Sequence, residues 1–176
     1  MGKETDRRPH ELTLEEIARA AKDVALRDGG HAPTIIAEGG LESVVGQLPE
    51  LPGTTKGRVR YLRSVGLTLG QSTDIGPLKR VFFITEGWMS SPQGGIFPDV
   101  RPSLDPNRTE VLLVLQMMVN EHQTHGVGFE MIRNADGHLT VLRELSDLND
   151  DGAQADSPLL EAFVTGFQSG RQSRAN

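Results

Sequence analysis

The sequence predicts an α+β fold, a single domain with a mainly antiparallel sheet of about six strands and three main helices. Three observations lead to this prediction. Apolar residues recur at helical spacing in three capped stretches, and the segments between them are short and apolar with glycine-containing turns. The elements follow in the order helix, hairpin, helix, four strands, helix. The length of 176 residues suits one domain, which we expect at 13–170, with flexible tails at 1–12 and 171–176.

The first helix is predicted to begin after Thr13. The threonine hydroxyl can accept from the backbone N–H of Glu16, whose carboxylate can accept from the N–H of Thr13, and this arrangement is a capping box. Gly29 ends the helix, because glycine readily adopts the left-handed conformation found there. One apolar stripe indicates that the helix covers a core, and it consists of Leu14, Ile17, Ala18, Ala21, Val24 and Ala25.

The other two helices are also placed by their caps. Thr54 or Thr55 begins the second, and Ser157 followed by proline begins the last. Gly66 and Gly70 weaken the prediction of the second helix, because glycine costs about 1 kcal/mol relative to alanine inside a helix.

Six segments are predicted to be strands, at 34–37, 43–46, 79–86, 110–118, 127–133 and 138–144. Gly39-Gly40 suits the turn of the first hairpin, and Gly137 suits the position of positive φ in the last one. The apolar run at 110–118 predicts a central strand that is covered on both faces. Between strands, we expect residues 90–107 to form a long loop, a kind of segment that often carries function.

Composition and charge exclude several classes of protein. The chain has no cysteine, so disulfides, thiolate zinc sites and cysteine nucleophiles are excluded. A net charge of −6 argues against a general nucleic-acid binder. We find no apolar stretch long enough to span a membrane and no signal peptide, and expect a cytoplasmic protein with no membrane partner. One strand of the early hairpin should lie at a sheet edge, which predicts a homodimer.

Two patterns resemble metal sites, and neither is complete. Asp147, Asn149 and Asp151 match the start of a calcium loop, but its closing glutamate is replaced by Pro158. His122 and His125 lie three residues apart in a predicted turn, without an evident third ligand. We therefore expect no structural metal, and the absence of a glycine-rich phosphate loop leads us to expect no cofactor.

The stretch FFITEGWMSSP is the strongest candidate for a functional site. Glu86 lies near the end of a predicted strand, on the same face as apolar neighbours. Arg101 and Arg108 in the following loop are possible partners for its carboxylate. In one interpretation, Glu86 and an arginine pin the loop to the sheet, with Trp88 buried beneath it as an anchor. In the other, the end of strand 79–86 and loop 90–107 enclose a ligand pocket.

The segment TEGWMSSP, followed by RPSLDPNRTEVLLV, resembles an uncharacterised family of small bacterial proteins with no assigned activity. The resemblance covers about the middle third of the chain, implies a folded α+β domain, and transfers no site residues. We expect a non-catalytic binding or interaction protein. The alternative is an enzyme or small-ligand binder that uses the pocket at 79–86 and 90–107.

A second similarity is one of order alone. Trp88, Pro92, Ser103 and Asp105 follow the order found in JAB/MPN-type metalloproteases, but residues 89–91 lack the zinc-binding histidines. The similarity would imply an inactive member of that family, and we do not adopt it.

Overall fold

The structure is a computed structural model that describes residues 11–90, 99, 101–145 and 157–175. These residues form three α-helices, a single-turn 3₁₀ helix and one six-stranded antiparallel sheet, which confirms the α+β fold. In chain order the elements are α1 (Leu14–Asp28), β1 (Thr34–Gly39), β2 (Ser43–Gln47), α2 (Thr55–Gly70), β3 (Leu78–Met89), η1 (Pro102–Leu104), β4 (Thr109–Met118), β5 (Gln123–Arg133), β6 (Leu139–Glu144) and α3 (Pro158–Ala175).

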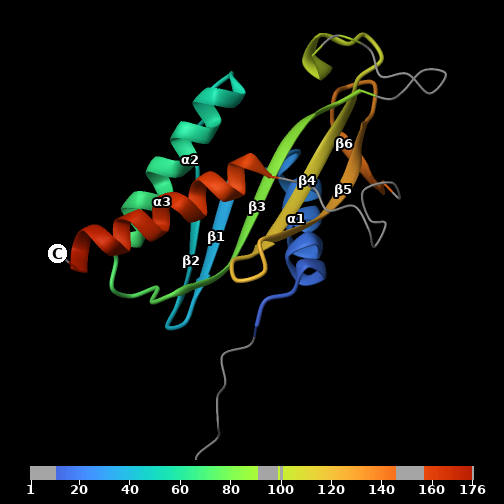
Figure 1. The fold of residues 1–176 in the computed structure, drawn as a ribbon. Helices are drawn as coiled ribbons and strands as arrows, with labels where there is room; N and C mark the ends of the chain where they lie inside the picture. The colour runs from blue at the N-terminus through green and yellow to red at the C-terminus, as the bar shows by residue number, and fades with distance from the viewer. Residues whose placement is uncertain (1–10, 91–98, 100, 146–156, 176) are drawn as a thin grey trace, which may run out of the picture.

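The strands lie in the order β2-β1-β3-β4-β5-β6, and every neighbouring pair is antiparallel (Figure 1). The central strand β3 continues to Met89, three residues beyond the predicted end, so it places Glu86 and Trp88 within the sheet. Strand β5 begins at Gln123 instead of residue 127. The β4–β5 turn is consequently short, and His122 adopts a positive φ of 52° in it.

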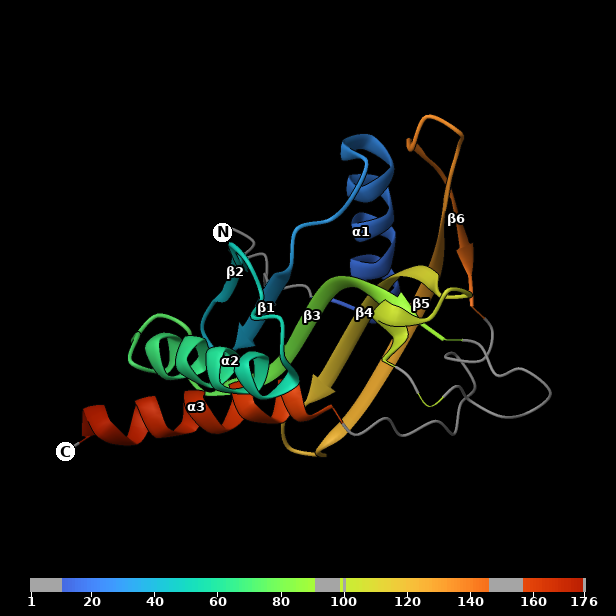
Figure 2. The same ribbon diagram turned by 90° about the horizontal axis from the view of Figure 1, so that it is seen from above.

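The helices cover the two faces of the sheet, with α1 on one side and α2 with α3 on the other (Figure 2). Adjacent residues of β3 point to opposite faces. Phe82 packs in the cluster that contains α1, whereas Phe83 packs in the cluster that contains α2 and α3. Both rings are fully buried. The sheet therefore separates two apolar cores that share the same central strands.

Helix α1 forms as its sequence predicts. The backbone N–H of Glu16 donates to the hydroxyl of Thr13 at 3.2 Å, and the backbone N–H of Thr13 donates to the Glu16 carboxylate at 2.9 Å. Gly29 ends the helix with φ 77°. The buried stripe on the sheet side consists of Ile17, Ala18, Ala21 and Ala25. Three alanines in this stripe let the helix axis lie close to the strands.

Helices α2 and α3 pack against each other through their backbones. A Cβ added to any of four glycines would lie 2.0–2.2 Å from a carbonyl oxygen of the opposite helix: Gly66 meets Phe163, Gly70 meets Phe167, Gly166 meets Arg63, and Gly170 meets Leu67. The contacts advance along both helices in the same direction, so the two helices run parallel. The two glycines that weakened the prediction of α2 are thus the residues that permit its packing.

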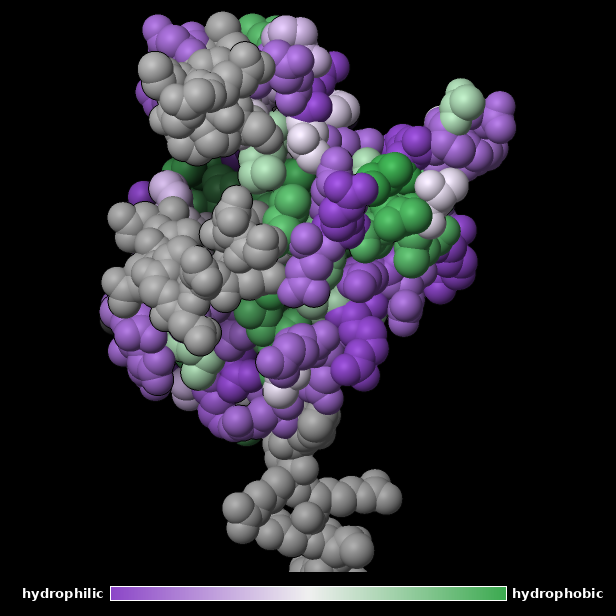
Figure 3. Space-filling model, turned by 90° about the vertical axis from the view of Figure 1, so that its right-hand side faces the viewer, coloured by the Kyte–Doolittle hydropathy of each residue, from purple (hydrophilic) through white to green (hydrophobic). Residues whose placement is uncertain are grey.

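The face on the right-hand side of Figure 1 is mainly hydrophilic, with hydrophobic residues in a few patches (Figure 3). No helix in the described ranges is long and apolar enough to cross a membrane. Helix α3 continues to Ala175, so residues 171–175 are helical where a tail was expected. The residues at 1–10 and 176 lie outside the described part.

Candidate functional site

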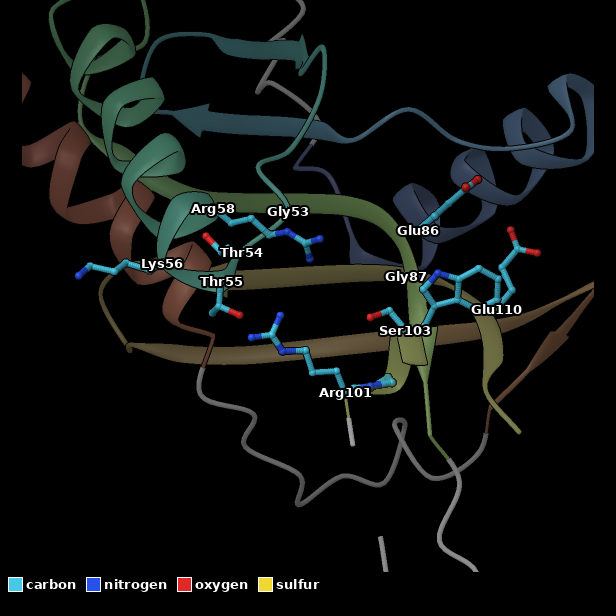
Figure 4. Close-up of a pocket in the computed structure, with 12 residues that line it drawn as sticks. Gly53, Thr54, Thr55, Lys56, Arg58, Glu86, Gly87, Arg101, Ser103 and Glu110 are labelled. Carbon is cyan, nitrogen blue, oxygen red and sulfur yellow. The ribbon is translucent and has the colours of Figure 1, made fainter. Parts of the chain in front are cut away.

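A cavity lies where the start of α2, the end of β3 and the segment around η1 meet (Figure 4). Its volume is about 730 Å³, within the range of small-molecule sites. The described residues that line it are Gly53, Thr54, Thr55, Lys56, Arg58, Glu86, Gly87, Trp88, Arg101, Pro102, Ser103 and Glu110. Three of the four residues predicted for a pocket, Glu86, Trp88 and Arg101, are therefore part of this lining.

Two arginines from separate elements reach into the same space. Figure 4 shows Arg58, from the first turn of α2, and Arg101, from the segment before η1, extending towards each other with Thr55 beside them, whereas Lys56 points away. The Nε of Arg58 donates to the Pro52 carbonyl at 2.8 Å, which fixes its direction. The backbone carbonyl of Arg101 accepts from Leu104 at 2.8 Å, but its side chain has no hydrogen-bond or ion-pair partner among the described residues. The guanidinium of Arg101 is thus available to a ligand.

The start of α2 adds to the positive potential of this region. Gly57 donates its backbone N–H to the hydroxyl of Thr54, the N-cap residue, at 3.1 Å. The first turn contains no acidic residue, although it carries Lys56 and Arg58. A helix start carries a partial positive charge and normally favours acidic side chains. Cations in this turn are unfavourable unless an anion lies nearby. The sequence TTKGR, which begins α2 and contains both cations, therefore already indicated a site for an anion.

Glu86 faces away from the two arginines. Its carboxylate accepts a hydrogen bond from the backbone N–H of His31, and a Cβ on Gly30 would lie 2.8 Å from its Oε1. Glu86 thus holds the segment that follows α1 (Figure 4). The expected ion pair with Arg101 or Arg108 does not occur in the described structure. The sequence did not indicate His31 as the partner, because the contact is made by a backbone group 55 positions away.

The side chain of Trp88 is partly open to solvent. The residue is 44% exposed, so the prediction that it is largely buried is wrong. The guanidinium of Arg108 lies 4.4 Å from the centroid of the ring, at a distance typical of a cation–π contact. Arg108 also donates to the Ser103 carbonyl at 2.8 Å, so it joins the tryptophan to the η1 segment without lining the cavity. An arginine covers the indole where apolar packing was expected.

The second acidic residue of the cavity, Glu110, is held by Arg133. The Nε and one terminal nitrogen of the guanidinium donate to the two carboxylate oxygens, each at 2.8 Å. The other terminal nitrogen donates to the Gly29 carbonyl at 2.9 Å, which connects the end of α1 to β4 and β5. The hydrogen bond that Arg133 donates to Glu110 raises the pKa of Arg133, and burial opposes this rise. The negative charges of Glu110 and Glu86 also raise it. Arg133 was not among the residues predicted from the sequence.

Two patterns in the sequence resembled parts of a metal site without being complete. His122 and His125 are both exposed, and no group of three histidine, aspartate or glutamate side chains that could hold an ion is found in the described ranges. Asp147, Asn149 and Asp151 lie outside the described residues.

Comparison with known proteins leaves the site to be interpreted from its own geometry. No family model matches the chain, and neither a curated protein nor a solved structure matches it. The resemblance of the middle third to an uncharacterised bacterial family therefore stays a prediction.

Proposed function

We propose that this protein is a non-catalytic binding protein that holds a small anionic ligand, one with a carboxylate or phosphate group, in the cavity at the start of α2. The observation that supports this most directly is the approach of Arg58 and Arg101 from separate elements into one space (Figure 4). A planar guanidinium can donate two parallel hydrogen bonds to a carboxylate or phosphate. The chain provides two such groups beside the positive end of a helix.

The distribution of charge around the cavity favours an anion over a cation. Both acidic residues in the lining are already engaged, Glu86 by the His31 backbone and Glu110 by the Arg133 guanidinium. Neither carboxylate is directed at the arginines. An anion would therefore meet positive groups on the α2 and η1 sides, and it would not displace an existing ion pair.

The same contacts favour binding over catalysis. A general base must reach the proton that it removes, within a hydrogen-bond distance or through one water. The two carboxylates that could act in this way are held elsewhere, Glu86 by the His31 backbone and Glu110 by the Arg133 guanidinium. Both point away from Arg58 and Arg101 (Figure 4). The Thr54 hydroxyl accepts the capping hydrogen bond of α2, so it is occupied by a structural role. An enzyme would be distinguished by turnover of the bound molecule.

The single tryptophan provides the test, because Trp88 lines the cavity and reports directly on its contents. We expect saturable changes in its fluorescence on titration with inorganic phosphate, citrate or AMP at constant ionic strength. Arg58→Gln and Arg101→Gln should each weaken binding about tenfold or more, the usual effect of removing a charged hydrogen bond. Thermal denaturation with the same anions provides an independent measurement.

The matched control is Arg60→Gln, which removes an equal charge from the same helix at a position that lines a different groove. This variant should bind as the unmodified protein does. Equal weakening in all three variants would show a nonspecific effect of net charge. If none of the three anions changes the fluorescence or the melting temperature, the proposal is wrong.

A further inference from the structure

The two edge strands of the sheet, β6 and β2, differ in how well they are protected from pairing with another chain. Edge strand β6 carries Arg143 and Glu144, and a register shift interrupts its pairing with β5 at Ile132/Arg133. Edge strand β2 has the sequence SVVGQ, contains neither charge nor proline, and pairs with β1 in unbroken register. Charges and bulges are the usual means by which an edge is kept from pairing with another chain. Only β2, of these two edges, lacks them.

The backbone of β2 has a defined set of groups that point outwards. Gly39 donates to the Glu42 carbonyl and Leu48 donates to the Pro33 carbonyl, so residues 42 and 48 face β1. Because inward and outward residues alternate in an antiparallel ladder, residues 44 and 46 face β1 as well. The N–H and C=O groups of Ser43, Val45 and Gln47 therefore point away from the sheet. This outward set is symmetric about Val45.

We propose that β2 pairs antiparallel with β2 of a second copy of this chain, about a two-fold axis that passes between the two Val45 residues. Ser43 of each copy then lies opposite Gln47 of the other, and Val45 lies opposite Val45. Three residue pairs with two hydrogen bonds each give six bonds, which use every outward group of the strand. The two sheets join into one continuous sheet, with both α1 helices on the same face.

The side chains around this edge suit contact with an identical surface. Val45 is 65% exposed, and in the dimer it meets its own copy across the axis. On the opposite face, a groove of about 290 Å³ runs between β2 and α2. The residues that line it are uncharged: Ile35, Val44, Gly46, Gln47, Leu48, Ser64, Val65, Thr68 and Leu69. A symmetric interface places like groups near one another. In a chain of net charge −6, an uncharged edge avoids the repulsion between like charges that such an interface would otherwise contain.

The oligomeric state and its dependence on Val45 test the proposal. Light scattering at tens of micromolar should give a mass of about 38 kDa, twice the 19.2 kDa of the chain. Val45→Lys places two ammonium groups together and should weaken dimerisation roughly a hundredfold or more. The control Val141→Lys changes the same residue type on edge strand β6, where the side chain is 48% exposed, and should leave the dimer intact. Mixing Val45→Lys with Val45→Glu should restore a dimer.

A second measurement, chemical crosslinking, detects the dimer without placing a charge in the interface. The protein has no cysteine, so Val45→Cys introduces a unique thiol. A short bis-maleimide should join two Val45→Cys chains covalently in high yield, whereas Val141→Cys should remain uncrosslinked. A monomer in light scattering, or equal crosslinking of the two variants, would overturn the proposal. Tryptophan titration of Val45→Lys separates this proposal from the anion site, since the variant should still bind any anion that the unmodified protein binds.

Discussion

The two faces of the sheet are covered in different ways. On one face, a single helix, α1, rests on the strands through side chains, with three alanines in its buried stripe. On the other, α2 and α3 form a parallel pair whose backbones meet at four glycines, and Phe163 and Phe167 of α3 fill the space above the strands. Packing on the α1 face depends only on the size and spacing of side chains. Packing on the other face also depends on the absence of side chains where α2 and α3 meet.

This difference shows why glycine has opposite effects in different helices. An exposed glycine in a helix lowers stability through the entropy of the unfolded chain. At Gly66, Gly70, Gly166 and Gly170 that cost is accepted because any larger residue would collide with the carbonyl of the opposite helix. Such close contact allows dense packing of the two backbones. The spacing of four residues within each pair places both glycines of a helix on one side.

The largest expected effects come from the rings that fill the two cores. Phe82→Ala and Phe83→Ala should each lower the free energy of unfolding by about 3–5 kcal/mol, because both rings are completely buried. Denaturant unfolding measures the two losses. Hydrogen exchange should separate the faces, with Phe82→Ala increasing exchange in α1 and Phe83→Ala increasing it in α2 and α3. Increased exchange in the same helices for both variants would contradict the separation into two cores.

A smaller but more specific effect is expected at the contact between the helices. Gly166→Ala should lower the free energy of unfolding by about 2–3 kcal/mol, because its Cβ would lie 2.0 Å from the Arg63 carbonyl oxygen and force the helices apart. At a free helical position the same change would stabilise the chain by about 0.5–1 kcal/mol, so the sign of the effect is decisive. Urea denaturation provides the measurement.

The control for this change is Gly53→Ala. No heavy atom lies within 4 Å of the Cβ that the substitution would add, and φ is not positive. Its stability should remain within about 0.5 kcal/mol of the unmodified protein. A stabilised Gly166→Ala variant would show that α2 and α3 lie farther apart than the structure places them.

Local patterns predicted most of the fold. The Thr13 capping box, the alanine stripe of α1 and Gly137 in the last hairpin depend on neighbouring residues, and all are present as expected. The role of Gly66 and Gly70 could not be predicted, because it depends on a helix almost a hundred residues away. No local pattern reports a contact at that separation.

Less of the candidate site than of the fold could be predicted from the sequence. A cavity lies at the end of β3, and Glu86, Trp88 and Arg101 line it, but half of the loop 90–107 that was predicted to enclose a pocket lies outside the described residues. The partners of the acidic residues were not predictable, since Glu86 meets the His31 backbone and Glu110 meets Arg133 across the fold. Arg58 could have been found, because a basic first turn opposes the helix dipole.

The smallest effects are expected at the N-terminal caps of α1 and α2, which lie on opposite faces of the sheet. Thr13→Ala should lower the free energy of unfolding by about 1 kcal/mol, because it removes the hydroxyl that accepts from Glu16 and leaves that N–H without its cap. Thr54→Ala should cost about 0.5 kcal/mol, since the Thr54 hydroxyl accepts a single bond from Gly57 and α3 holds α2 in place along its length. Thermal denaturation of both variants measures the difference. Thr140→Ala on β6 is the comparison, because it removes an exposed hydroxyl that donates to the Ile132 carbonyl but caps no helix. A greater loss for Thr54→Ala would mean that α2 depends on its cap more than on its packing against α3.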